Sequence, residues 1–298
     1  PSERYILITK SNLRKGHLAA SCTWVQVDVE GPPARHSPAM AYDSRREVVV
    51  LFGGFTGRER DANMYGDTWG WDGRQWRLVA QTGPTPRSRF GMAYDPGREV
   101  VVLFGGIPRD TADTWEWDGT QWQRIETEGG PSGRSRVAMA YHPERQIVIL
   151  FGGRLPDGQP AGDTWEWDGT TWTLLAPSGA HARARHGMVF EPKLGTLISH
   201  GVAFAGRPET LVWTGDEWEP LFVSMATEPQ NTSRRGSARE SVRQPARESA
   251  ERTSSRRLGP APRIYYGMVY DAAREATVLF GGWDGSAPLG DTWVLRCE

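Results

Sequence analysis

The sequence predicts an all-β protein: a five-bladed β-propeller in which each blade is a sheet of four antiparallel strands. Two repeated features predict it. A phrase of the form DTWxWDGxxW occurs at 67–76, 113–122 and 163–172, and its first residues return at 291–293. A segment of the form MAYD recurs as well, and its methionines are Met40, Met92, Met139, Met188 and Met268. Four-strand units that repeat at roughly 47 residues stack radially into a propeller.

Each repeat has the same order along the chain. An arginine precedes the MAYD strand, a turn with a second arginine follows, and an apolar run such as 48–52 leads to Phe-Gly-Gly. Apolar, β-branched runs bounded by glycine are typical of strands buried on both faces. A variable loop, the DTWxW strand, a turn and a last strand of the form xWxxL complete the unit. Asp and Gly at 94–99 and 117–121 favour tight turns because both tolerate positive φ.

This order places the blades at about 35–79, 87–125, 134–175, 183–221 and 263–297, with 23–28 completing the last. The spacing from Met188 to Met268 exceeds one period by about 31 residues. The surplus, 226–258, is rich in Ser, Arg, Glu and Pro and cannot bury enough apolar surface to offset the entropy of ordering it. We expect a disordered insertion there. The propeller domain spans 22–298, and residues 1–21 are an N-terminal extension.

The Phe-Gly-Gly segments, each followed by a spaced pair of tryptophans, resemble kelch repeats. The segments are 52–54, 104–106, 151–153 and 280–282, and the resemblance covers about 23–221 and 259–297. It implies a propeller of the galactose-oxidase type. It does not imply one function, because kelch propellers serve as binding modules, as scaffolds and occasionally as enzymes.

The last repeat stops at residue 297, after its third strand. Its missing fourth strand has the form xWxxL, and TWVQV at 23–27 fits that form. We therefore expect the N-terminal strand to complete the C-terminal blade, which protects strand edges that an open ring would expose.

The two cysteines of the chain lie at this junction. When the last repeat is matched to the second, Cys297 falls on Gly119 and Cys22 on Thr120, which are neighbours at a hairpin tip. We expect a Cys22–Cys297 disulfide, with two reduced thiols as the alternative. A bond that closes nearly the whole chain contributes on the order of 4–5 kcal/mol in the chain-entropy model. It favours a secreted or periplasmic location, and a cytoplasmic one is the alternative.

Two sets of arginines are expected on one face of the propeller, together with the variable loops. The first set, the repeated arginines, occupies one position in every blade: Arg35, Arg87, Arg134, Arg183 and Arg263. The second, the mouth arginines, lies two residues later: Arg89, Arg136 and Arg185, with Ser37 and Tyr265 at the same position in the other blades. Guanidinium groups suit carboxylates and phosphates. A residue repeated in every blade equally suits one structural pairing in every blade, so both interpretations of the first set stay open.

Residues that break the repeat are further candidates for binding. Phe90, Val137, His186 and Tyr266 share the position after the mouth arginines, and Trp283 alone among the tryptophans lies off the pattern. With Tyr265, these side chains give a rim of aromatic residues and arginine that is typical of recognition surfaces. Packing of the loops explains any single one of them equally well.

The fourth repeat is degenerate. It has ISHGV at 198–202 where the others have LFGG, and it carries His181, His186 and His200. Three histidines raise a metal hypothesis, but their spacing matches no metal motif. Both cysteines are assigned to the disulfide, which leaves none for a copper site like that of galactose oxidase. The chain lacks a G-x-S-x-G motif, a P-loop and H-E-x-x-H.

The sequence therefore favours a non-catalytic binding or scaffold module without a cofactor. An enzyme or metal-dependent factor with a site in the fourth blade is the alternative. A net charge of −1 and the absence of a long apolar run argue against nucleic acid and membrane partners. We expect a monomer whose partner is a protein, a peptide or a small acidic ligand. A third hypothesis makes the basic segment 226–258 a flexible arm for an acidic partner.

Overall fold

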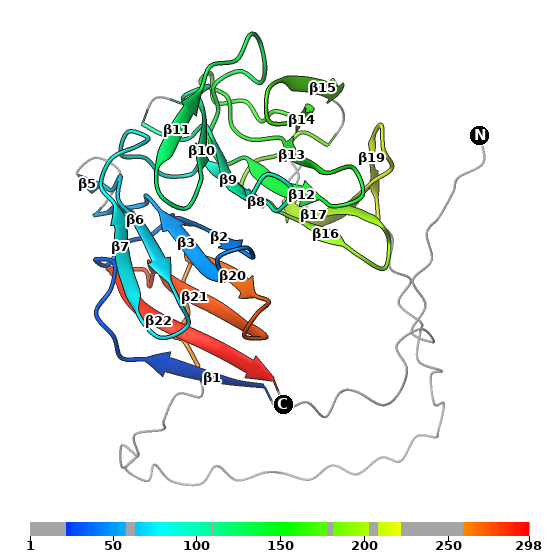
Figure 1. Cartoon of the computed structure of the whole chain (residues 1–298). Coiled ribbons are helices and arrows are strands. Elements are labelled where there is room, and N and C mark those ends of the chain that lie inside the picture. Colours follow the sequence, from blue (N-terminus) through cyan, green and yellow to red (C-terminus); the bar gives the residue numbers. More distant parts are fainter. Residues whose placement is uncertain are drawn as a thin grey trace, which may run out of the picture.

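The computed structural model describes residues 22–57, 63–108, 110–177, 181–202, 208–221 and 259–297. Over these residues the chain forms five four-stranded antiparallel sheets around a common axis, and a two-stranded ribbon of β4 (Phe55–Thr56) and β5 (Asn63–Met64) (Figure 1). The predicted five-bladed propeller is confirmed. The predicted N-terminal extension at 1–21 and the insertion at 226–258 lie outside the described residues.

The sheets are called blades 1 to 5 in chain order, and their strands follow the order that the repeats predict. Blade 1 contains β2 (Ala39–Asp43), β3 (Val48–Phe52), β6 (Thr68–Trp71) and β7 (Trp76–Ala80). Blade 2 contains β8 (Gly91–Asp95), β9 (Val100–Phe104), β10 (Thr114–Trp117) and β11 (Trp122–Ile125). Blade 3 contains β12 (Ala138–His142), β13 (Ile147–Phe151), β14 (Thr164–Trp167) and β15 (Trp172–Ala176). Blade 4 contains β16 (Gly187–Glu191), β17 (Thr196–Val202), β18 (Pro208–Trp213) and β19 (Trp218–Pro220). Blade 5 contains β20 (Gly267–Asp271), β21 (Ala276–Trp283), β22 (Pro288–Cys297) and β1 (Cys22–Val27).

The hydrophobic core lies between neighbouring blades. One cluster joins Val102 and Phe104 of blade 2 to Leu150 and Trp167 of blade 3, all of them fully buried. The tryptophan that opens the fourth strand of a blade also reaches back to the threonine of DTW in the preceding blade. These Nε1–H to Oγ1 hydrogen bonds are Trp76 to Thr292, Trp122 to Thr68, Trp172 to Thr114 and Trp218 to Thr164, at 2.8–2.9 Å. The tryptophan and the threonine therefore recur together in the sequence because a hydrogen bond between neighbouring blades needs both of them.

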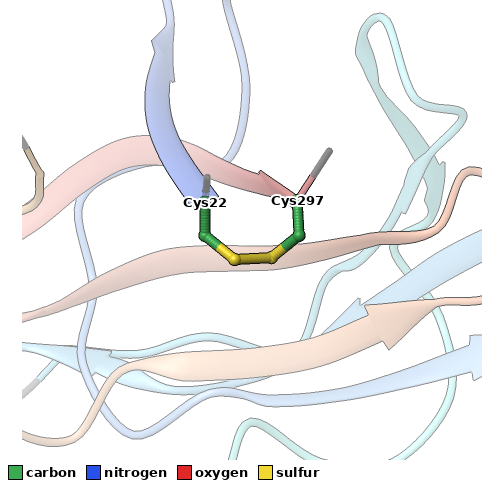
Figure 2. Close-up of a disulfide and its surroundings, with 2 residues drawn as sticks. All are labelled: Cys22 and Cys297. Carbon is green, nitrogen blue, oxygen red and sulfur yellow. A yellow bond between two sulfur atoms is a disulfide. The ribbon is translucent and has the colours of Figure 1, made fainter. Parts of the chain in front are cut away.

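The N-terminal strand completes blade 5, as predicted. In β1, Trp24 pairs with Leu295 of β22, the same register in which Trp122 pairs with Trp117 in blade 2. Cys22 pairs with Cys297, and a disulfide joins the two residues across a Cα–Cα distance of 4.0 Å (Figure 2). The chain ends of the described propeller are therefore linked both by a strand pair and by a covalent bond.

Among the described residues, four of the inter-blade junctions share a second link that is absent between blades 4 and 5. The N–H of the second glycine of Phe-Gly-Gly donates to the carbonyl of the next blade's repeated arginine: Gly54 to Arg87, Gly106 to Arg134, Gly153 to Arg183 and Gly282 to Arg35, at 2.8–3.0 Å. Within the described residues, blades 4 and 5 share neither this bond nor a tryptophan–threonine bond, and Oγ1 of Thr210 instead contacts Nδ1 of His200 at 2.8 Å.

Apolar side chains remain exposed along that junction. Val189 of blade 4 and Met268 and Tyr270 of blade 5 are more than half exposed, at 56%, 53% and 55%. The blade 3 counterpart of Met268, Met139, is 8% exposed and packs against Gly91 of blade 2. We call this surface the seam, defined by Val189, Met268 and Tyr270. Blades 4 and 5 are held together less tightly than any other pair of neighbouring blades in the described chain.

Candidate functional site

A cavity of about 630 Å³ opens at one end of the propeller axis, and all five blades contribute to its wall. We call it the mouth cavity. The structure brings most of the predicted binding residues together here: Arg89, Phe90, Arg136, Arg185, His186, Arg263, Tyr265 and Tyr266 line it. Arg35, Arg87, Arg134, Arg183 and Trp283 lie outside this wall. Sequence reasoning missed Pro38 and Ile264, which complete the apolar part of the lining.

One backbone position in each blade shapes the rim of the cavity. Ser37, Arg89, Arg136, Arg185 and Tyr265 all have left-handed φ angles, between 54° and 62°. This conformation costs a residue other than glycine on the order of 1–3 kcal/mol and persists where the surrounding structure imposes it. Hydrogen bonds between blades impose it here: the N–H of Ser37 donates to the carbonyl of Tyr265, that of Arg136 to Arg89 and that of Arg185 to Arg136, at 2.6–3.2 Å. The rim is therefore a fixed frame that presents these side chains.

The repeated arginines point inward and are paired with carboxylates. Their side chains are at most 3% exposed. Arg134, for example, forms a two-pronged pair with Asp163 at 2.5 and 2.8 Å and also donates to the carbonyl of Gly152 at 3.1 Å. The corresponding pairs are Arg35–Asp67, Arg87–Asp113, Arg183–Glu209 and Arg263–Asp291. This geometry favours the structural interpretation, in which each arginine ties the start of its blade to the DTW strand.

The paired aspartates have lowered pKa values. Burial by itself raises the pKa of Asp113, but the hydrogen bonds and the charge of Arg87 outweigh burial and bring that pKa down to about 2. The same opposition between burial and the paired arginine lowers the pKa of Asp67, Asp163 and Asp291. These carboxylates are therefore charged across the whole physiological pH range.

We expect the free energy of unfolding to fall as the pH drops from about 4, the ordinary pKa of an unfolded aspartate, to about 2, the pKa of folded Asp113. A carboxyl whose pKa is lower in the folded state contributes stability above its unfolded pKa, and this contribution is lost as the pH falls through the folded value. Urea unfolding between pH 2 and 7 measures the slope. Asp113→Asn removes one such group and should make the loss shallower; an equal slope in both proteins would contradict this assignment.

The aromatic candidates divide into exposed and packed residues. Tyr265 and Tyr266 are 44% and 40% exposed at the cavity wall, next to Ile264 at 53%. Phe90 is buried and packs edge-on against Phe52, with ring centroids 5.5 Å apart. Trp283 is half-buried in β21. The two tyrosines are therefore the aromatic residues best placed to meet a ligand.

The three histidines of blade 4 do not form a common site. Nδ1 of His181 faces Glu209 at 3.3 Å, and His200 contacts Thr210. Both ring nitrogens of His186 are buried, and burial, with the nearby charge of Arg183, lowers the pKa of His186 to about 3. Its ring packs edge-on against Phe151 in the place that Phe90 takes against Phe52. The part of the chain that the structure describes contains no group of three His, Cys, Asp or Glu placed to hold a metal.

A comparison with known protein families identifies the repeat. The model of the KLHDC2/KLHL20/DRC7 Kelch-repeats domain matches residues 17–191, more than half of the chain. The chain belongs to the kelch-repeat family. Kelch domains are generally used to bind proteins. The match ends with β16, just before the strands in which blade 4 departs from the repeat. Among the described residues of this kelch domain, no helix is long and apolar enough to span a membrane.

Proposed function

We propose that this kelch propeller is a non-catalytic binding module that takes an acidic segment of a partner protein, or a small acidic ligand, at the mouth cavity. The observation that carries the proposal is the placement of Arg89, Arg136 and Arg185, which reach one cavity from three consecutive blades. The described residues that line the cavity include no aspartate or glutamate. A concave site lined by one sign of charge concentrates ligands of the opposite sign.

The neighbouring wall adds apolar contact to this charge. Ile264, Tyr265 and Tyr266 of blade 5 line the same cavity, and all three side chains are exposed. Tyrosine combines a large apolar ring with a hydroxyl group, and it is enriched at the centres of protein interfaces. Guanidinium groups pair with carboxylates through two parallel hydrogen bonds. The site is suited to a peptide that carries a carboxylate beside an apolar side chain.

Selection from a library of random peptides tests this function. We expect the wild-type propeller to enrich acidic peptides, and the triple variant Arg89→Ala, Arg136→Ala, Arg185→Ala to bind them at least about tenfold more weakly, a loss of about 1.4 kcal/mol. The control removes the same charge elsewhere: Arg45, Arg77 and Arg124 are 67%, 65% and 56% exposed and lie outside the cavity wall. Equal binding by the mouth variant and the control variant would overturn the proposal.

We further propose that the protein works in an oxidising compartment, that is, as a secreted or periplasmic protein. The Cys22–Cys297 disulfide supports this location, because such bonds persist where thiols are not kept reduced.

A further inference from the structure

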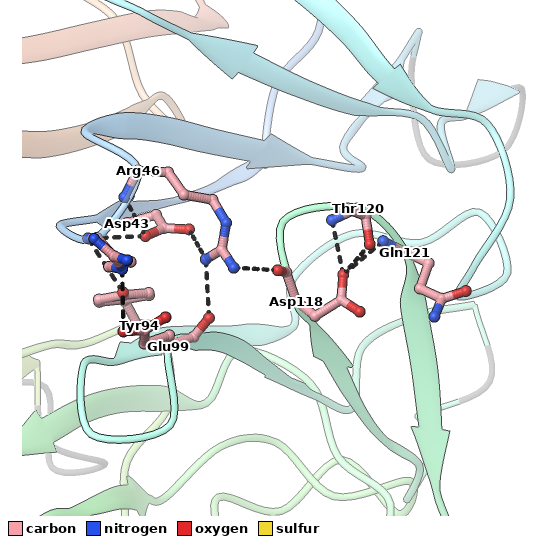
Figure 3. A network of polar contacts seen from close by, with 8 residues as sticks. Asp43, Arg46, Tyr94, Glu99, Asp118, Thr120 and Gln121 are labelled. Atoms are coloured by element: carbon pink, nitrogen blue, oxygen red, sulfur yellow. Dashed lines mark hydrogen bonds and ion pairs between the residues drawn. The ribbon is translucent and has the colours of Figure 1, made fainter.

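On the face opposite the mouth cavity, an arginine of the first turn in a blade bridges that blade to the next. Arg46 of blade 1 donates to Oδ2 of Asp43 at 2.7 Å, to the carbonyl of Glu99 at 3.0 Å and to the carbonyl of Asp118, the last two in blade 2 (Figure 3). Its guanidinium lies against Gly119, where an added Cβ would collide with it. The bridge is thus an arginine-shaped slot made of one carboxylate, two carbonyls and a glycine.

The slot is filled at two further junctions. Arg274 of blade 5 bonds Asp271 at 2.9 Å and the carbonyl of Glu47 in blade 1 at 2.8 Å, and it lies against Gly73. Arg98 of blade 2 bonds Asp95 at 2.9 Å, pairs with Glu116 of its own blade and lies against Gly169 of blade 3. The repeat therefore builds the same slot several times and fills it each time from within the chain.

Between blades 3 and 4 the corresponding arginine does not enter the slot. His142 replaces the aspartate, and Arg145 keeps a pair with Glu166 of its own blade at 2.7 Å, as Arg98 does with Glu116. An added Cβ at Gly215, the counterpart of Gly119, would have no atom within 4 Å. Arg98 holds both Asp95 and Glu116, so with His142 in place of the aspartate the ion pair of Arg145 is the one with the equivalent glutamate, Glu166. The space at Gly215 belongs to a cavity of about 450 Å³, whose wall includes His142, Glu144, Gly195, Trp213 and Thr214 together with Arg145 itself.

The lining of this empty slot has unused hydrogen-bonding capacity. Nδ1 of His142 and Nε1 of Trp213 are buried without a hydrogen-bond partner, and the two residues are 5% and 2% exposed. The indole Nε1–H of Trp213 is a donor, as are all the N–H groups of a guanidinium, so only the acceptors of the lining can bind such a group and Trp213 is a neighbour of the site. Burial and the charge of Arg145 lower the pKa of His142, so its ring is neutral and has a nitrogen lone pair that can accept. Gly195 and Thr214 occupy the repeat positions of Glu99 and Asp118, whose carbonyls bind Arg46. Glu144 adds a carboxylate close to Gly195.

We propose that this slot between blades 3 and 4 binds a guanidinium group supplied from outside the chain, either the side chain of an arginine in a partner protein or a free guanidino compound. The group takes the place that Arg46 fills between blades 1 and 2. It donates to Nδ1 of His142, to the carbonyls of Gly195 and Thr214 and to the carboxylate of Glu144. The planar fork of a guanidinium matches several acceptors at once, which a compact ammonium does not. The site lies on the turn face and does not depend on the function proposed for the mouth cavity.

NMR of the full chain with 15N-labelled tryptophan tests the proposal, because the indole N–H of Trp213 lies beside the slot. The Trp213→Phe variant assigns its signal. We expect butylguanidine to move this signal in a saturable way with a millimolar dissociation constant, and butylamine, which differs only in its head group, to bind at least fivefold more weakly. The peptides acetyl-Gly-Arg-Gly-amide and acetyl-Gly-Lys-Gly-amide repeat the comparison for a protein-borne side chain. Shifts by butylguanidine alone assign the slot to a small ligand, and shifts by the arginine peptide as well assign it to a partner's arginine.

Two variants separate binding from structure. His142→Asp restores the aspartate of the repeat, so Arg145 should turn into the slot and weaken butylguanidine binding at least tenfold. Adding Arg145→Ala to that variant empties the slot again, and binding should return. A wild-type signal that does not saturate, an equal response to butylamine, or unchanged binding by His142→Asp would each overturn the proposal. Failure of the double variant to recover binding would do the same.

Discussion

Replacing Cys22 and Cys297 with serine is expected to lower the free energy of unfolding by about 5 kcal/mol in the chain-entropy model. The bond joins residues 275 positions apart, so in the unfolded state it closes a loop of nearly the whole propeller. Loss of the bond leaves β1 held by its strand pairing with β22 and by the packing of Val27 against the core between blades 5 and 1. Urea unfolding of the double variant and of the wild type, both under oxidising conditions, measures the difference.

A reducing agent provides the matched control for this experiment. Dithiothreitol should destabilise the wild type by about as much as the double substitution does, and it should leave the double variant unchanged. Mass spectrometry under non-reducing conditions should find no free thiol in the wild type. Two free thiols in fresh protein, or a wild type that dithiothreitol does not destabilise, would refute the bond and remove the support for an oxidising compartment.

The architecture of this protein could be predicted from its sequence because the repeated residues show which positions of neighbouring strands pair with one another. Trp293 and Trp24 each have a counterpart in blade 2, and matching them was enough to place Cys22 opposite Cys297. Register follows from such patterns because a shift by one residue would turn every side chain of a strand to the other face. The repeat therefore specified the sheet, the closing strand and the disulfide together.

The role of the repeated arginines could not be decided in the same way. A buried arginine and an arginine at a binding rim look alike in a sequence, and their partners lie 26–32 residues away. A signal was present nonetheless. The aspartate of DTW recurs once per blade just as the arginine does, and in blade 4 another carboxylate, Glu209, replaces it. A cation and an anion that repeat together predict a pair.

The seam and the empty slot could not be predicted, because each depends on a contact that is absent. His142 and His200 look like ordinary drift in the sequence. In the structure, each histidine lies where the repeat has a link between blades. His142 occupies the position of the aspartate in the arginine bridge to blade 4. His200 contacts Thr210, whose counterparts in other blades accept a hydrogen bond from a tryptophan of the next blade. Blade 4 is therefore joined differently on both of its sides. The departures from the repeat gather at its junctions and in its second strand, where Ser199 and His200 occupy the positions of Leu150 and Phe151 in blade 3.

Arg134→Ala is expected to lower the free energy of unfolding by about 3–5 kcal/mol, the usual cost of removing one partner of a buried ion pair. The substitution leaves the carboxylate of Asp163 without its guanidinium and the carbonyl of Gly152 without its donor. Arg136, two residues along the same segment, lines the mouth cavity and is half-buried, so Arg136→Ala should cost less than about 1 kcal/mol. Urea unfolding at pH 7 compares the two variants.

Arg134→Lys shows whether charge alone accounts for the loss. A lysine ammonium keeps the positive charge but cannot bond both oxygens of Asp163 and the carbonyl of Gly152 in one plane, so its stability should lie between those of the wild type and Arg134→Ala. Substitutions at Arg134 and Arg136 should also differ in their effect on peptide binding. Arg136→Ala weakens capture of acidic peptides with little change in stability, whereas Arg134→Lys loses stability while its folded fraction still binds. If Arg134→Ala were as stable as Arg136→Ala, the repeated arginines would have to be returned to the candidate binding surface.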